Sequence, residues 1–303
     1  MDQAPADACP GGEHADREGP RPRAPRQRGA HLPDGRGALV SGETPPVAPA
    51  ADYDLFVDWA KRLDREGPFF RRLLDEAGAR SLIDVGAGSA RHAVMFASWG
   101  LSVDAVDPDD SMLAQAEANI AEAAARIAEA GGAVTLRRGG FGGLAGLDLG
   151  PADALTCTGN ALPHVAGRAG LREALADFAA VVRPGGVLVL HLLNHARLLA
   201  ARPRAIPPVV RDTPEGMTVF LRVIDYPLGD EYIGFDFMTM TRDAAGEWSL
   251  AHRRSAHTAL PAELLRAELE ASGFSDVRTY GGHDLHPLTD DDESAVYVAT
   301  RSG

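Results

Sequence analysis

The sequence predicts an α/β protein with a doubly wound, mostly parallel sheet of seven strands and an inserted antiparallel β-sheet. Between residues 81 and 193, short apolar runs alternate with segments of helical periodicity, which is typical of a parallel sheet covered on both faces. From residue 219 to residue 257, three segments alternate in polarity and are rich in aromatic and β-branched residues, as antiparallel strands are.

The elements of the main sheet follow one another in a regular order. Two short helices are expected first, separated by the helix-breaking pair Gly67-Pro68. Strands and helices then alternate, and Pro184-Gly185-Gly186 ends the last helix of this series. The strands are expected at 81–85, 101–106, 134–136, 152–156 and 187–193, and the helices at 90–99, 111–129 and 171–182.

The pattern changes after Asn194. A proline-rich stretch, residues 202–213, breaks the alternation, and the strands of the inserted sheet follow at 219–226, 232–241 and 248–257. A helix at 261–272 and strands at 274–280 and 295–300 would complete the main sheet. The expected parts are a tail at 1–50, a core at 51–196, an inserted β lid at 197–258 and a C-terminal completion of the core sheet at 259–303.

Composition argues against several classes of protein. Residues 1–50 are rich in Pro, Gly, Ala and Arg and nearly free of aromatic residues, so a disordered tail is expected there. The formal net charge of −13 disfavours a nucleic-acid partner, because a polyanion would be repelled. Neither a secretory signal nor a run of about 20 apolar residues occurs, so the expected location is cytoplasmic, without a membrane partner. The oligomeric state is left open.

The residues that follow the first two strands indicate a nucleoside site. Gly86 and Gly88 allow a tight turn and a close approach of a ligand to the backbone. In such sheets, ligands bind beyond the carboxyl ends of the strands. Asp107 ends the second strand 21 residues after Gly86, where a carboxylate can accept hydrogen bonds from both hydroxyls of a ribose. Together these features predict a cofactor that contains a nucleoside.

The chemistry of the turn selects among such cofactors. A dinucleotide site calls for a third glycine, and Arg91 stands at that position. No phosphate-binding Lys follows, and the acidic Asp84 before the glycines would repel a pyrophosphate but tolerate an ammonium group. Since S-adenosylmethionine carries an ammonium group and a ribose and has no phosphate, it is the predicted cofactor.

Three motifs resemble those of the class I S-adenosylmethionine-dependent methyltransferases, whose fold is Rossmann-like. They are Ile83-Asp84-Val85-Gly86-Ala87-Gly88, Val106-Asp107-Pro108 with Ser111-Met112-Leu113, and Val182-Arg183-Pro184-Gly185-Gly186. The resemblance implies a full set of cofactor contacts. They are Asp84, Gly86, Ala87 and Gly88 at the methionine end, Arg62 at its carboxylate, Asp107 at the ribose, Pro108 and Met112 beside the adenine, Gly140 and Phe141 on its other side, and in addition Tyr53 and Thr158.

A narrower resemblance concerns the acceptor. Residues 157–164, Cys-Thr-Gly-Asn-Ala-Leu-Pro-His, resemble the Gly-Asn-x-x-x-His segment of the glycine and sarcosine N-methyltransferases. We therefore expect Asn160 to bind the methyl acceptor and His164 to orient it or accept its proton. The same group has an Arg after the fifth strand for the amino-acid carboxylate, and Leu193 stands there, which argues against glycine or sarcosine as the acceptor.

Two pairs of histidines raise the question of a metal site. No Cys or carboxylate cluster completes a tetrahedral ligand set near either pair, so no metal is expected. The pairs are His191 with His195 and His283 with His286. Candidates for lining a lid over the site, with structural packing as the alternative role, are Tyr53, Arg222, Tyr226 and His257.

The sequence thus predicts an enzyme that methylates a nitrogen, or with less support an oxygen, of a small molecule. Three alternatives stay open: an NAD(P)-dependent oxidoreductase, a non-catalytic protein that binds S-adenosylmethionine, and a nucleic-acid methyltransferase. Arg91 argues against the first. The acidic charge, and the absence of an Asn-Pro-Pro-aromatic or Asp-Pro-Pro-aromatic tetrapeptide after the fourth strand, argue against the last.

Overall fold

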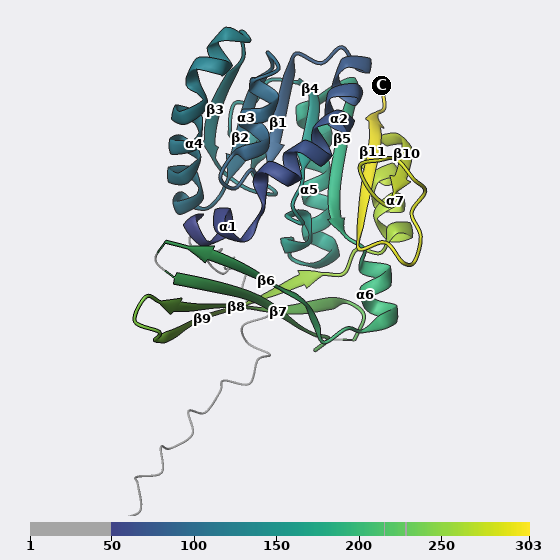
Figure 1. The fold of residues 1–303 in the computed structure, drawn as a ribbon. Coiled ribbons are helices and arrows are strands. Elements are labelled where there is room, and N and C mark those ends of the chain that lie inside the picture. Colours follow the sequence, from purple (N-terminus) through teal and green to yellow (C-terminus); the bar gives the residue numbers. More distant parts are fainter. Residues whose placement is uncertain (1–49, 215, 228) are drawn as a thin grey trace, which may run out of the picture. The chain divides into compact units, whose positions relative to one another are not determined.

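The computed structural model describes residues 50–303, with the exception of residues 215 and 228 (Figure 1). The predicted disordered tail therefore lies outside the described residues, apart from Ala50. The described part of the chain holds a main sheet, the helices that cover it and a second, smaller sheet.

The main sheet has seven strands, as predicted. They are β1 (Ser81–Val85), β2 (Ser102–Asp107), β3 (Ala133–Arg138), β4 (Ala152–Cys157), β5 (Val182–Leu193), β10 (Phe274–Tyr280) and β11 (Ser294–Arg301). Their spatial order is β10-β11-β5-β4-β1-β2-β3. The strands from β1 to β5 run parallel, and β11 runs antiparallel to both of its neighbours. The mostly parallel sheet is confirmed.

Helices cover both faces of this sheet, which confirms the doubly wound fold. On one face pack α2 (Trp59–Glu76), α3 (Arg91–Ala97) and α4 (Asp110–Glu129), and on the other α5 (Gly167–Val181) and α7 (Ala262–Ala271). Shorter elements are α1 (Ala50–Phe56), η1 (Leu144–Gly146), η2 (Leu162–His164) and α6 (His195–Ala201). Among the described residues, no helix combines the length and the apolar character that crossing a membrane would require.

A single long helix, α2, replaces the two short helices expected before the sheet. Pro68 stands in its middle, although a proline in a helix interior removes one backbone hydrogen bond. The turns on either side share one buried face, which carries Gly67, Phe69, Phe70 and Leu74. Burial of this continuous face outweighs the lost bond. The break predicted at Gly67-Pro68 was wrong because it considered local propensity alone.

The smaller sheet has four antiparallel strands in sequence order: β6 (Ala205–Thr213), β7 (Gly216–Asp225), β8 (Tyr232–Asp243) and β9 (Trp248–Thr258). The last three correspond to the predicted strands. The first, β6, lies in the proline-rich stretch that was expected to break the pattern. Pro207 and Pro208 are accommodated because β6 is an edge strand, paired only with β7, and its register shifts between Ile206 and Val209.

Several hydrogen bonds attach the smaller sheet to the core, and the sheet lies below the main sheet in Figure 1. Arg211 of β6 donates from Nε and Nη2 to the carbonyls of Leu55 and Phe56 in α1, both at 3.1 Å. At the end of β9, the Thr258 hydroxyl donates to the carbonyl of Val165 at 2.6 Å. These hydrogen bonds hold the smaller sheet next to the core.

Candidate functional site

The glycine turn after β1 meets the end of β2 at the carboxyl edge of the main sheet. Gly86 and Gly88 have φ values of 71° and 55°, which glycine adopts without the steric strain of other residues. A Cβ at Gly86 would lie 2.6 Å from the Cβ of Ala161, so only glycine lets the loop after β4 approach this turn. The backbone nitrogen of Gly88 donates to Asp107 Oδ2 at 2.8 Å.

The carboxylate of Asp107 is fixed before any ligand arrives. Its Oδ1 accepts a hydrogen bond from the backbone nitrogen of Asp109 at 2.9 Å, and its Oδ2 is held by Gly88. Each oxygen keeps a lone pair for a further donor, such as a ribose hydroxyl. Burial raises the pKa of Asp107, and the two backbone hydrogen bonds oppose this rise. Its contact with a ribose remains a prediction.

Asp84 lies in the body of β1, directly before the glycine turn. Its side chain is almost fully buried, and its Oδ1 accepts a hydrogen bond from the Thr156 hydroxyl at 2.7 Å. Burial raises the pKa of Asp84, while His92 and Arg62 lower it. A buried carboxyl group at this place is compatible with the ammonium group of the predicted cofactor.

Arg62 offers a cationic partner for a ligand carboxylate. Its Nε donates to Glu66 Oε1 at 3.0 Å, and its guanidinium lies over the ring of Trp59. Its Nη2 is buried and has no hydrogen-bond partner among the described residues. Both terminal nitrogens lie 3.8 Å from the position of a Cβ at Gly159, in the loop after β4. An orphaned guanidinium nitrogen facing this loop fits the carboxylate of S-adenosylmethionine.

Glu66 and His92 hold Arg62 in place. The Nε2 of His92 lies 2.8 Å from Glu66 Oε2, and Glu66 is fully buried. Burial alone would raise the pKa of Glu66, but the hydrogen bonds and charges of His92 and Arg62 hold it well below its usual range. Thr158, a predicted cofactor contact, lies 3.5 Å from His92 Nδ1. The sequence analysis missed Glu66 and His92, because only the packing of α2 on α3 brings them to the site.

Helix α1 covers the glycine turn. Asp54 accepts hydrogen bonds from the Ser89 hydroxyl and, at 3.0 Å, from Arg91 Nη2. The ring of Tyr53 then lies 3.8 Å from the position of a Cβ at Gly88. Tyr53 is therefore at the predicted cofactor crevice. Asp54, which fastens the helix, was not anticipated, since no local pattern links it to residues so far along the chain.

The structure brings together only some of the residues that were predicted to border the adenine. Met112 is buried, with its Sδ 4.0 Å from the position of a Cβ at Gly88. Gly140 lies beside Pro108, since its Cβ would be 3.7 Å from the Pro108 Cβ. Phe141 packs edge-on against Phe178 of α5 and thus belongs in part to the core. The ring of Phe141 is half-buried.

Asn160 joins the core to the smaller sheet. Its φ is 66°, a left-handed backbone conformation. Its Oδ1 accepts a hydrogen bond from the Leu193 nitrogen at 2.9 Å, and its Nδ2 lies 3.2 Å from His257 Nδ1 of β9. The amide nitrogen has two hydrogens, so one is left for an acceptor molecule. The predicted binding residue therefore also has a structural role that the sequence did not reveal.

His257 and His164 stand next to each other on the acceptor side. Their ring centroids are 4.3 Å apart, and His257 is only 7% exposed. Burial holds the pKa of His257 well below its usual range, so its ring is neutral and can accept the hydrogen bond from Asn160. His164 is exposed. It is therefore accessible to a molecule that enters between the two sheets.

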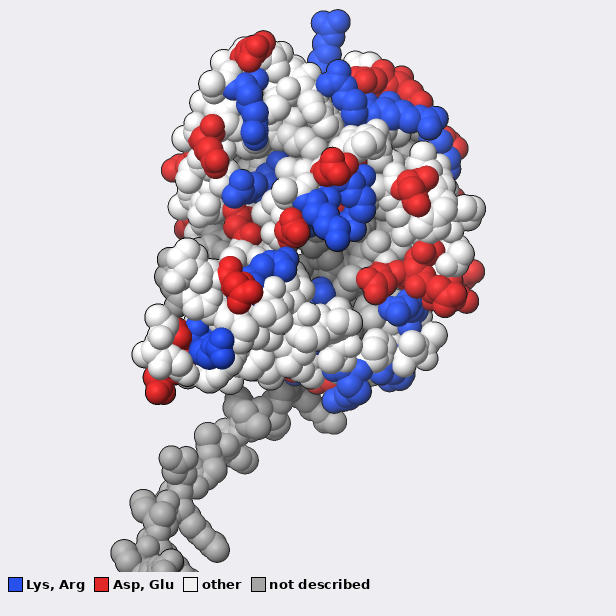
Figure 2. Space-filling view, in the orientation of Figure 1, with Lys and Arg blue, Asp and Glu red and all other residues white. Residues whose placement is uncertain are grey.

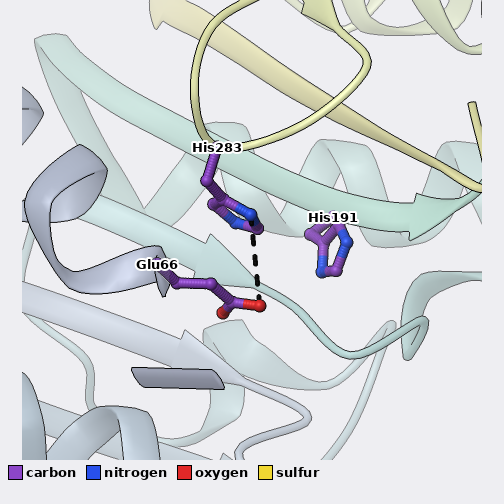
Figure 3. Close-up of side chains that lie close together, drawn as sticks. All are labelled: Glu66, His191 and His283. Atoms are coloured by element: carbon purple, nitrogen blue, oxygen red, sulfur yellow. Dashed lines mark ion pairs between the residues drawn. The ribbon is translucent and has the colours of Figure 1, made fainter. Parts of the chain in front are cut away.

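Beside Arg62 lies a cluster of Glu66, His191 and His283 (Figure 3). Their ligating atoms all lie within 4.8 Å of one another. The sequence did not anticipate this grouping, in which the fold brings one histidine of each expected pair, His191 and His283, together with Glu66 of a distant helix. His283 Nδ1 is 4.0 Å from Glu66 Oε1.

The chemistry of this cluster suits hydrogen bonding. Burial lowers the pKa of His191 well below its usual value and that of His283 to about 4, so both rings are neutral. Glu66 Oε1 already accepts a hydrogen bond from Arg62, so a cation at this oxygen would compete with the guanidinium. His191 Nδ1 and His283 Nε2 are buried without partners among the described residues. The absence of a metal ion remains a prediction.

Comparison with known proteins agrees with this geometry. Residues 82–186 match the family described as methyltransferase domain. Over 147 residues the chain is 35% identical to a glycine/sarcosine N-methyltransferase of Parasynechococcus marenigrum, which is 48% of this chain and 50% of the relative. A glycine/sarcosine N-methyltransferase of Aphanothece halophytica is 25% identical over 259 residues, 82% of this chain and 86% of the relative. The match thus spans about half the length of the first relative.

Solved structures share the fold. An S-adenosylmethionine-dependent methyltransferase from Clostridium acetobutylicum has a TM-score of 0.66 at 15% identity, covering 84% of this chain and 98% of its own. A sugar N-methyltransferase from Streptoalloteichus has a TM-score of 0.63 at 22% identity, covering 83% and 93%. The sheet order agrees with these solved structures in fold, and residues 82–186, which hold the glycine turn and Asp107, match a methyltransferase domain.

Proposed function

We propose that the protein transfers the methyl group of S-adenosylmethionine to a nitrogen, or with less support an oxygen, of a small-molecule acceptor. One observation carries the proposal: the glycine turn after β1 holds the carboxylate of Asp107, and the unpartnered Nη2 of Arg62 faces the neighbouring loop after β4. Nitrogen is favoured because the relatives from Parasynechococcus and Aphanothece are named N-methyltransferases.

On the donor side, the protein binds and orients. Arg62 would hold the cofactor's carboxylate, Asp107 its ribose, and Tyr53 would close the crevice from α1. When bound, S-adenosylmethionine supplies an activated methyl group on a sulfonium, which a lone pair of the acceptor displaces in line. Because the donor is already activated, the main task of the side chains is alignment.

On the acceptor side, Asn160 would donate its remaining amide hydrogen to the acceptor. His164 would orient the acceptor or accept the proton that a protonated amine or a hydroxyl must lose to expose its lone pair. Desolvation lowers the pKa of His164 below its usual value, so the ring is neutral at pH 7 and has a lone pair to accept that proton.

The proposal is tested first on the donor side. Asp107→Ala should weaken S-adenosylmethionine binding at least tenfold in calorimetric titration, because it removes charge-assisted hydrogen bonds worth ~1.5–3 kcal/mol. Asp110→Ala is the matched control, since Asp110 is an exposed carboxylate nearby that pairs with Arg138. An unchanged dissociation constant for Asp107→Ala would refute the ribose role.

The acceptor side is tested by a metabolite screen with a donor that carries a labelled methyl group. For any acceptor found, Asn160→Ala and His164→Ala should each lower kcat/KM at least tenfold, as expected for about 1.4 kcal/mol of lost transition-state stabilisation. Full activity in both variants would contradict the acceptor-side assignment. Binding of the donor without a labelled product from any acceptor would instead favour a non-catalytic binding protein.

A further inference from the structure

We infer that Arg222 forms a subsite for an anionic group, a carboxylate, on the acceptor. This inference rests on the proposed function, since it concerns the molecule that is methylated. It adds a substrate class to that function: small molecules that carry a carboxylate at a distance from the nitrogen to be methylated.

Arg222 lies on the inner face of the smaller sheet. On one face of β7, Thr218, Phe220 and Ile224 are buried, and the half-buried Arg222 stands between Phe220 and Ile224, which are 1% and 0% exposed. Because side chains alternate between the faces of a strand, these residues share one side. Across the sheet, Arg222 is in register with Phe237 of β8. The guanidinium thus lies among the apolar side chains of Phe220, Ile224 and Phe237.

This guanidinium has no anionic partner of its own. It lies over the ring of Phe56, with 5.1 Å between its Cζ and the ring centroid. Within the described part of the chain it makes neither a hydrogen bond nor an ion pair, and only the charge of Glu293 acts on it at longer range. Desolvation by burial lowers its pKa. A half-buried guanidinium with several free donors is costly unless an anion completes it.

Two contacts relate Arg222 to the proposed cofactor and acceptor residues. Phe56, on which it stacks, ends α1, the helix whose Tyr53 covers the glycine turn. On the same inner face, His257 of β9 holds Asn160. Figure 2 shows a recess between the core and the smaller sheet. Arg222 and His257, the partner of Asn160, lie on the same face of the smaller sheet. An acceptor that spans Arg222 and Asn160 would be bound by its anion at one end and by its nitrogen at the other.

A carboxylate fits this subsite better than a phosphate. One guanidinium matches the single charge of a carboxylate and can bind it through two parallel hydrogen bonds. A phosphate dianion would need a second cation. Arg253, which is on the same face, is in register with Phe237 from β9 and already interacts within the described structure.

The test uses an anionic probe that cannot be methylated. The full chain, loaded with S-adenosylhomocysteine, is titrated with trifluoroacetate and, as the neutral counterpart, trifluoroacetamide, and binding is followed by ¹⁹F NMR. We expect trifluoroacetate to bind at least tenfold more tightly than the amide. Arg222→Met, which keeps the packing of the side-chain stem on Phe56, should remove this preference.

Two further variants complete the design. Arg202→Met is the matched control, because Arg202 also stacks on an aromatic ring but is paired with Asp230 on the surface; it should leave trifluoroacetate binding unchanged. Should Arg222→Met lack a cooperative thermal transition, Arg222→Lys, which cannot form a two-point pair, is expected to weaken binding about threefold.

The inference is overturned if wild type does not prefer trifluoroacetate to its amide, or if both Arg222 variants retain that preference in full. Failure of the proposed function has a different signature. If no acceptor is methylated in the metabolite screen while trifluoroacetate still binds through Arg222, the anion subsite stands and methyl transfer is refuted. If an acceptor without a carboxylate is methylated and its kcat/KM is unaffected by Arg222→Met, methyl transfer stands and the subsite is refuted.

Discussion

A side chain at Gly86 would collide with the loop that follows β4. Gly86→Ala should therefore weaken S-adenosylmethionine binding at least tenfold and destabilise the fold, because its Cβ would lie 2.6 Å from the Cβ of Ala161. Gly78 supplies a matched control: its φ of 60° is also left-handed, but a Cβ there would have no neighbour within 4 Å. Gly78→Ala should cost only the backbone strain, ~1–2 kcal/mol. Urea denaturation and calorimetric titration measure both quantities.

Equal losses of stability in the two alanine variants, with cofactor affinity unchanged in both, would contradict this reading of Gly86. Such a result would mean that the loop after β4 yields by several tenths of an ångström without disturbing the crevice. The comparison separates two effects that a single variant would mix, namely the left-handed backbone and the close approach.

At the level of single residues, the sequence predicted the part of the site that is local in the chain. Gly86, Gly88 and Asp107 stand at strand ends, and that placement is readable from apolar runs. Glu66 and Asp54 were not predicted, since no local sequence pattern links them to their distant partners His92 and Ser89.

Among the elements, α2 tolerates an interior proline. Pro68→Ala should raise the free energy of unfolding by about 1–3 kcal/mol, because it restores a backbone hydrogen bond and removes a steric conflict with the preceding turn. The proline ring itself is exposed, so no buried contact is lost. Lys61→Ala, an exposed change in the same helix, should alter the unfolding free energy by less than about 0.5 kcal/mol.

Urea denaturation midpoints measure this difference. A destabilised Pro68→Ala variant would contradict the expectation and would indicate that rigidity of the unfolded chain at Pro68 matters more than the missing bond.

The two wrong predictions about elements have a common cause. Gly67-Pro68 and Pro207-Pro208 are strong local signals for the end of a helix or strand, and both were interpreted as breaks in secondary structure. In the structure, burial of a shared helix face overrides the first, and an edge position in the smaller sheet accommodates the second. Whether a strand lies at the edge or in the centre depends on the strand order of the sheet, and local propensity carries no information about that order.

For the whole molecule, buried neutral histidines couple stability to pH. Burial lowers the pKa of His195 and of His283 to about 4, against about 6.5 in an unfolded chain. Between these values the unfolded state binds more protons than the folded state. The free energy of unfolding should therefore fall as the pH is lowered from 7 to 5, by ~1 kcal/mol per pH unit for each histidine.

Urea denaturation at pH 7, 6 and 5 measures this slope. His195→Gln should reduce this slope by the contribution of about one proton, because the variant lacks the titrating imidazole of His195. A slope that stays the same in this variant would show that other groups carry the pH dependence.

How the two sheets meet could not be predicted from the sequence. The inserted antiparallel sheet was expected from its alternation, but its attachment depends on single long-range contacts, such as Asn160 with His257 and Arg211 with α1. These contacts join residues about a hundred or more positions apart, and no periodicity encodes them.

The prolines of β6 also bear on self-association. An exposed edge strand offers unpaired amide groups on which another chain can add a strand, a common route to aggregation. Pro207 and Pro208 have no amide hydrogen to offer, and the register shift beside them disturbs the ladder further. This border of the smaller sheet is consequently a poor template for a fifth strand, whether from a second copy or from a misfolded neighbour.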